Sequence, residues 1–251
     1  MPAAEEARPS ATRTTRYGAV LPSRLFLGMV ACAAILAAAA LPMAWISAQR
    51  DLGRIDQLPG MAAWFEITQP RNLATWYSAL LLAVGSWLSF QISRLRRRSQ
   101  HRDAHRWTAA SIVLALMACE EIALFHEVAG GPLRSFLGDA IGPAYASALP
   151  SAFAALITIC YCGPLWFRLP RPIRAPLFWA SVLYIGAALG LDTFTDSWAR
   201  ETGWTQSARI LSVMEETIEM VAIAIAVQAL VNYRERLVRR RNAAPYTVRM
   251  A

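Results

Sequence analysis

The sequence predicts an all-α membrane protein, a polytopic helical bundle with six transmembrane helices and both termini in the cytoplasm. Hydrophobic residues make up 56% of the 251 residues and charged residues only 17%, whereas soluble domains hold about 25% charged residues. The hydrophobic residues gather in runs of roughly 20, the length of helix that crosses a bilayer. The arginines are concentrated in alternate loops, as the positive-inside rule requires.

Six hydrophobic runs are predicted to span the membrane, and none alternates in the manner of a transmembrane β-strand. They cover about residues 25–47, 73–93, 107–129, 147–167, 176–194 and 207–231. The first run is too long and starts too late for a cleaved signal peptide. The spans form one domain, residues 21–233, between a cytoplasmic tail with the composition of a disordered segment (1–20) and a basic cytoplasmic tail (234–251).

The basic residues set the predicted orientation. All 25 are arginine. Nineteen lie in the N-terminal tail, the loops around residues 94–106 and 168–174 and the C-terminal tail, and six lie in the alternate connections. This asymmetry places both tails in the cytoplasm. Orientation and contact with anionic lipid explain these arginines, so the bilayer is the expected partner and nucleic acid is not.

The start of the second span is polar. Asn72 and Thr75 are interpreted as candidates for a helix cap. Alternatively, Asn72, Thr75 and Ser78 form a polar wall that, with Glu66, supports a site among the spans. Met61 and Trp64, in the preceding connection, predict a short segment that lies at the membrane interface.

Acidic residues occur in the third, fifth and sixth spans, and the predicted topology brings them to one leaflet. Span three runs outward, so Glu120 lies about 20 Å and Glu127 about 30 Å along it. Asp192 lies near the outer end of span five. Span six runs inward, which places Glu216 and Glu219 roughly 12–18 Å below the outer surface.

Helical phase predicts which of these side chains share a face. Glu120, His126 and Glu127 fall within one arc of about 120°, whereas Glu121 points away from it. In span six, Glu215 lies with Glu216 and Glu219 in an arc of about 100°. Each of these two groups of side chains is able to face the interior of the bundle, so we expect one shared site.

A charged side chain at the centre of a bilayer costs about 2.5–3.5 kcal/mol, so the negative charge of these acidic side chains must be compensated. Few cations are near: Arg71, Arg200 and Arg209. Carboxylates with one imidazole suit iron, manganese or zinc, and a divalent metal is the expected cofactor. The predicted ligands are Glu120, His126, Glu127, Asp192, Glu216 and Glu219. The residues predicted to support these ligands are Glu121, Glu215, Glu66, Asn72 and Ser78.

The predicted function is that of a metal-dependent membrane enzyme, or a metal-binding protein, that acts at the outer leaflet on a lipid-like substrate. Two alternatives remain open. The same acids are suited to the ion site of a proton- or ion-coupled transporter, or they are hydrogen-bonded structural groups in an accessory membrane subunit.

Three motifs carry a resemblance: "NLATWYS" at the start of the second span, "EEIALFHE" at the end of the third and "EETIEM" in the last. With them the chain resembles a functionally uncharacterised group of bacterial multi-pass membrane proteins, which implies the bacterial cytoplasmic (inner) membrane and a shared outer-leaflet site. A fainter similarity is to the alkaline ceramidase and adiponectin-receptor hydrolases. Those enzymes hold zinc with three histidines, and this chain has only His126 in a predicted span.

Overall fold

The computed structural model describes residues 23–50, 60–67, 72–125, 128, 132, 135–137 and 143–243, and their regular structure is helical throughout. The elements are α1 (Arg24–Gln49), the 3₁₀ turn η1 (Gly60–Phe65), α2 (Leu73–Arg98), α3 (Ala104–Ala123), α5 (Pro143–Arg168), α6 (Arg171–Ile185), the π-helical turn η2 (Gly186–Leu191), α7 (Asp192–Thr202) and α8 (Gln206–Ala243). The all-α class predicted from the sequence is confirmed for this part of the chain.

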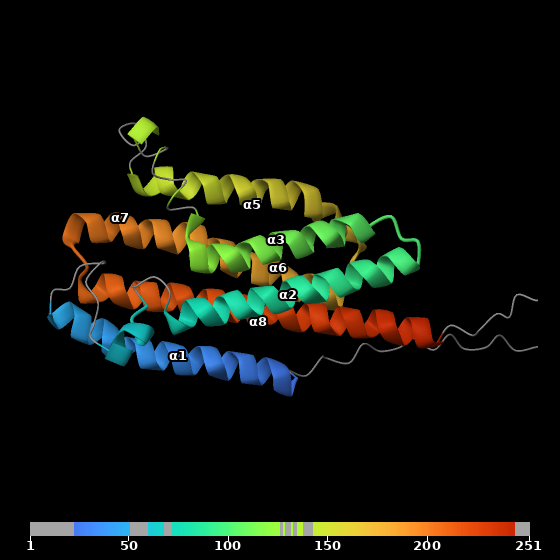
Figure 1. The fold of residues 1–251 in the computed structure, drawn as a ribbon, viewed down its shortest axis with the longest axis horizontal. Coiled ribbons are helices and arrows are strands. Elements are labelled where there is room, and N and C mark those ends of the chain that lie inside the picture. The colour runs from blue at the N-terminus through green and yellow to red at the C-terminus, as the bar shows by residue number, and fades with distance from the viewer. Residues whose placement is uncertain are drawn as a thin grey trace, which may run out of the picture.

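The helices lie side by side along one long axis, and α6, η2 and α7 follow one another as a single rod (Figure 1). The central helix is α8, which packs against α1, α2 and α6. α3 packs mainly on α2, and α5 lies at the edge of the bundle against α3, η2 and α7.

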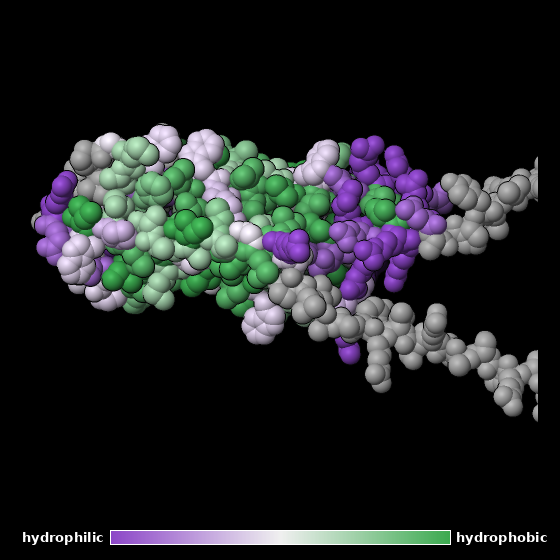
Figure 2. Space-filling model, turned by 90° about the horizontal axis from the view of Figure 1, so that it is seen from below, coloured by the Kyte–Doolittle hydropathy of each residue, from purple (hydrophilic) through white to green (hydrophobic). Residues whose placement is uncertain are grey.

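The basic segments lie at one end of the bundle. The start of α1, the α2–α3 connection, the α5–α6 turn and the end of α8 meet there, and we call it the basic end (Figure 1). The α7–α8 turn and the end of α1 lie at the opposite end, which we call the far end. Hydrophilic residues cover the basic end, and hydrophobic residues cover most of the adjoining surface (Figure 2).

Four segments are long and apolar enough to cross a membrane: Arg24–Gln49, Leu73–Arg98, Ala148–Arg168 and Arg171–Thr202. They correspond to predicted spans one, two, four and five. The two remaining predicted spans are also helices, α3 and α8. Neither is among those four segments, and both carry acidic side chains. Large exposed side chains on α1 and α5, such as Ile35 (68%) and Phe153 (64%), give the bundle the apolar surface of a membrane protein.

The helix ends follow local signals in most places. Asn72 caps α2, because its Oδ1 accepts a hydrogen bond from the Thr75 N–H at 2.9 Å; this confirms the capping interpretation. At the basic end, α8 continues beyond the predicted end of span six at residue 231 to Ala243.

The third predicted span ends early, and the reason is local. α3 stops at Ala123, and Leu124 adopts a left-handed conformation with φ 53° and ψ 44°. This conformation is unfavourable for a non-glycine residue and does not continue a right-handed helix. The prediction that span three runs to residue 129 is therefore corrected, and His126 and Glu127 lie outside the residues that the structure describes.

Gly85 of α2 faces both α3 and α8. A β-carbon added at Gly85 would lie 3.5 Å from Leu114 Cδ1 of α3 and 3.8 Å from Val227 Cγ2 of α8. These are ordinary van der Waals separations, so alanine would fit at this position without displacing either helix.

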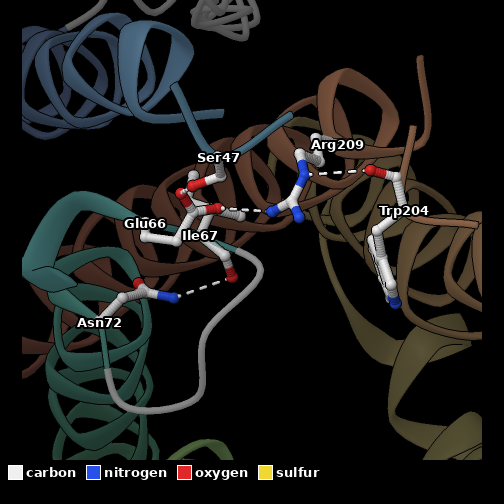
Figure 3. Close-up of polar contacts among 6 residues, drawn as sticks. All are labelled: Ser47, Glu66, Ile67, Asn72, Trp204 and Arg209. Atoms are coloured by element: carbon white, nitrogen blue, oxygen red, sulfur yellow. Dashed lines mark hydrogen bonds and ion pairs between the residues drawn. The ribbon is translucent and has the colours of Figure 1, made fainter. Parts of the chain in front are cut away.

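A buried ion pair joins distant parts of the chain at the far end (Figure 3). Arg209 Nη1 of α8 lies 3.3 Å from Glu66 Oε1, and the two side chains are 0% and 1% exposed. The Ser47 hydroxyl of α1 donates a hydrogen bond to the other carboxylate oxygen of Glu66. Arg209 Nε also donates to the Trp204 carbonyl oxygen at 3.2 Å. The pair therefore connects α1, the segment before α2, the α7–α8 turn and the start of α8.

We expect Arg209→Ala to destabilise the protein strongly, because the change leaves the Glu66 carboxylate buried without its cation. Breaking a buried pair in this way costs about 3–5 kcal/mol, which corresponds to a fall in Tm of about 6–20 °C for a chain of this size. Thermal unfolding of the purified protein in detergent measures the change.

The matched control is Arg200→Ala. Arg200 lies 3.8 Å from Asp196 in an exposed pair on α7, and such pairs contribute about 0–1 kcal/mol. The double variant Glu66→Leu/Arg209→Met should recover part of the loss, since it removes both charges together. Equal melting of Arg209→Ala and Arg200→Ala would contradict the assigned role of the pair.

Candidate functional site

Three separate segments bring acidic side chains together in the middle of the bundle. Glu216 of α8 interacts electrostatically with Glu121 of α3 and with Asp192 at the start of α7. Glu219, one turn further along α8, interacts with these three groups and with Glu215. We call the following residues the carboxylate cluster: Glu121, Asp192, Glu215, Glu216 and Glu219.

Tyr184 of α6 lies beside the carboxylate cluster and interacts with it. Its hydroxyl donates a hydrogen bond to Glu121 Oε1 at 3.1 Å, and it also interacts with Glu216 and Glu219. The bond links α6 to the end of α3. Sequence reasoning did not identify Tyr184, because a tyrosine in an apolar run is typical of a residue that faces lipid or the membrane interface.

The π-helical turn η2 sets the direction of Asp192. Tyr184 and Asp192 are eight residues apart, so in an unbroken α-helix their directions would differ by about 80°. A π turn holds one extra residue, which reduces the difference to about 20° in the opposite sense. Tyr184 and Asp192 therefore lie on nearly the same face of the rod, toward α8. π turns are frequent at functional sites in helical proteins.

The side chains of α8 are the most enclosed part of the cluster. Glu219 is 7% exposed. Glu216 Oε2 is buried and has no hydrogen-bond partner within the part of the chain that the structure describes. An unpaired buried oxygen on a carboxylate costs free energy, so its presence requires an explanation beyond packing.

The structure tests the grouping expected from helical phase. Asp192, Glu216 and Glu219 do lie together. Glu121, expected to point away from the site, instead faces it through Tyr184. Glu120 is half-buried, and Glu121 interacts with Glu216 and Glu219. The prediction from helical phase is wrong here because it assumed a regular α-helix through Leu124, where the helix ends.

The residues predicted to support the site from the start of α2 have other surroundings. Glu66 pairs with Arg209. Asn72 caps α2, and its Nδ2 donates to the Ile67 carbonyl oxygen at 3.1 Å (Figure 3). Ser78 is fully buried, and its hydroxyl has no hydrogen-bond partner among the residues described.

Within the described residues, no group of three or more His, Cys, Asp or Glu side chains is placed so that it could hold a metal ion. Two of the predicted ligands, His126 and Glu127, lie outside those residues. The charged groups that interact with Glu216 and Glu219 in the described part of the chain are carboxylates, so an arrangement suited to binding positive charge remains.

Comparison with known proteins identifies the family. No curated protein and no solved structure matches the chain. Residues 26–233 match the family described as "Domain of unknown function (DUF8692)". This match extends from the first turn of α1 through Tyr233 of α8, and it includes the whole carboxylate cluster and the Glu66–Arg209 pair. The chain therefore belongs to this family of unknown function, DUF8692.

Proposed function

We propose that the protein is a six-span integral membrane protein with its basic end in the cytoplasm, and that it works as a proton-coupled carrier through the carboxylate cluster. Four helices have the length and hydropathy of spans, and α3 and α8 pack along them. A helix that packs along spanning helices is able to cross the bilayer with them when its ionisable side chains face protein and not lipid. The arginine-rich loops favour the cytoplasmic orientation of the basic end.

The depth of the cluster supports a role within the membrane. α8 begins at Gln206 at the far end, so Glu216 and Glu219 lie about 15 Å and 20 Å along it. The hydrocarbon core of a bilayer is about 30 Å thick. The cluster then lies inside the bilayer, near its middle. Ionisable groups at such a depth are rare, and they mark ion or proton pathways.

The observation that carries the proposal is the buried Oε2 of Glu216, which lacks a hydrogen-bond partner in the described chain and lies beside other carboxylates. Several ionised carboxylates in one low-dielectric site repel one another, and each loses its hydration. A bound proton removes one of these charges and supplies the O–H group that an unpaired oxygen lacks. Release of that proton restores the repulsion, so the cluster has two states of different charge.

The position of α5 suggests how a substrate would reach the cluster. α5 packs against α3, η2 and α7, which carry or flank Glu121 and Asp192. Along most of its length its large side chains are exposed, as with Phe153 and Leu156. A helix with so little buried surface separates from its neighbours at low cost. The substrate we propose is therefore lipid-like or amphipathic and enters from the bilayer beside α5.

The second candidate is a metal-dependent membrane enzyme that acts on a lipid-like substrate. The number of carboxylates in the cluster favours it, because oxygen-rich sites with one imidazole suit iron, manganese or zinc. Its remaining ligands would be His126 and Glu127, which follow Glu121 closely in the chain. The two candidates differ in whether protons or a metal ion offset the negative charge of the carboxylates, and this difference can be measured.

The topology is tested with reporter fusions in the three helix connections that the structure describes. We expect fusions after Gln100 and after Pro170 to report the cytoplasm, since both positions lie at the basic end. A fusion after Gly203 at the far end should report the opposite side. A fusion at the C-terminus is compared with them, because the proposal places this end in the cytoplasm as well. Identical results at Gln100 and Gly203 would rule out six spans.

The substitution Glu216→Gln distinguishes the proton-coupled proposal from the metal candidate. Glutamine resembles the protonated acid in shape and charge, so the proton-coupled proposal predicts that the Tm at neutral pH is retained or raised. A chelator should leave the Tm of the wild type unchanged. Under the metal candidate, removing a bound ion present at 100 times its Kd costs about 2.7 kcal/mol, which lowers the Tm by about 5–11 °C. Thermal unfolding and elemental analysis of the purified protein measure both effects.

Glu201→Gln provides the control, because Glu201 is exposed on α7 and the substitution makes the same chemical change. Its Tm and metal content should equal those of the wild type. A parallel loss of Tm and metal in Glu216→Gln would replace the proton-coupled proposal with the metal candidate.

A further inference from the structure

A cavity of about 80 Å³ lies at the basic end, where the end of α2, the α5–α6 turn and the last turns of α8 meet. Its lining includes four arginines: Arg96, Arg168, Arg236 and Arg240. We propose that this cavity binds a phosphate group, carried either by the headgroup of an anionic phospholipid or by a soluble anion. This site is separate from the carboxylate cluster and does not depend on the function proposed for it.

Arg96 is held in place before any ligand binds. Its Nε donates to Asp103 Oδ1 at 3.0 Å, and its Nη2 contacts the other carboxylate oxygen. Asp103 is 2% exposed, so this pair belongs to the protein interior. A guanidinium has five N–H donors, and the pair with Asp103 uses two of them. An arginine fixed in this way loses little conformational entropy when it binds an anion.

Side chains of α8 form another part of the cavity wall. Tyr233 is stacked on Trp107, with ring centroids 5.4 Å apart, and is 5% exposed. Arg236 and Arg240 follow it at three and seven residues, so the three side chains share one face of α8. Since Tyr233 also lines the cavity, it is a further candidate donor, through its hydroxyl, for an anion held by the arginines.

The charge and shape of the cavity select the ligand. Asp103 offsets one of the four guanidinium charges, so the cavity favours an anion. Guanidinium groups bind phosphate oxygens in pairs of parallel hydrogen bonds. A space of this size holds several water molecules, each of which needs about 10–15 Å³, so a compact anionic group fits. Pro170 and Leu237 add an apolar margin, suited to the glycerol and first methylene groups of a lipid.

The location favours the same ligand class. The cavity lies at the basic end, and hydrophilic residues cover this end next to the hydrophobic surface of the bundle (Figure 2). In a membrane this is the level of the headgroups, where basic residues attract anionic lipid.

Some arginines on this part of α8 do not line the cavity, and these provide a control. Arg239 is 83% exposed and pairs with Glu235 of the next turn at 3.7 Å. Arg241 is also exposed. The double variants Arg236→Gln/Arg240→Gln and Arg239→Gln/Arg241→Gln remove two charges each from the same turns of the same helix. The first pair changes the cavity, and the second pair leaves its lining intact.

The experiment is calorimetric titration of the full chain in a neutral detergent. Three probes are compared: short-chain phosphatidylglycerol below its micelle concentration, phosphatidylcholine of equal chain length, and inorganic phosphate. We expect the wild type to bind phosphatidylglycerol more tightly than phosphatidylcholine, whose choline offsets the phosphate charge. Loss of Arg236 and Arg240 should weaken that binding about tenfold or more, since each arginine contact to phosphate is charge-assisted. Loss of Arg239 and Arg241 should weaken it less than about threefold, because only the screened surface charge changes.

The result identifies the source of the phosphate. Binding of phosphatidylglycerol without binding of inorganic phosphate assigns the cavity to a lipid headgroup. Comparable binding of inorganic phosphate, also lost in Arg236→Gln/Arg240→Gln, assigns it to a soluble anion. The proposal is overturned if no probe binds, if phosphatidylcholine binds as well as phosphatidylglycerol, or if the two double variants lose affinity equally. Melting curves of both variants confirm that they are folded.

Discussion

The buried pair between Glu66 and Arg209 is the constraint on which much of the fold depends. Removing two charges from water costs several kcal/mol for each ion, so the pair is stable only in good geometry and with further hydrogen bonds. Ser47 and the Trp204 carbonyl supply those bonds. The pair fixes the rotation of α8 near its start. Glu216 follows Arg209 by seven residues, about two turns, so the same rotation turns Glu216 toward the interior.

The pair also decides how charge is distributed along the molecule. Arg209 is buried at the far end, where it pairs with Glu66. The carboxylate cluster is therefore left with acidic neighbours, whereas the other arginines of α8 lie at the basic end. The proposed proton-coupled role and the proposed phosphate site both rest on this separation of charge along the long axis.

The carboxylate cluster depends on two local departures from regular helix. The left-handed Leu124 ends α3 three residues after Glu121, and the π turn before Asp192 rotates the following residues by about one position. Together they direct Glu121, Tyr184 and Asp192 toward α8, which contributes the remaining carboxylates. Irregular helix segments of this kind store strain and are maintained where a site requires them. The loosely packed α5 lies next to both.

The sequence by itself determined the helical class, the position of each helix to within a few residues at most ends, the cap at Asn72 and the sorting of arginines among the loops. These features depend on composition, hydrophobic runs and neighbouring residues. It also placed Asp192, Glu216 and Glu219 in one group, because the direction of each helix and the rise per residue fix their depth. Tertiary structure alone decided that Glu121 and Tyr184 join them and that Glu66 pairs with Arg209. Glu66 and Arg209 are 143 residues apart, and helix rotation, which sets such contacts, is determined by packing between helices and not by local pattern.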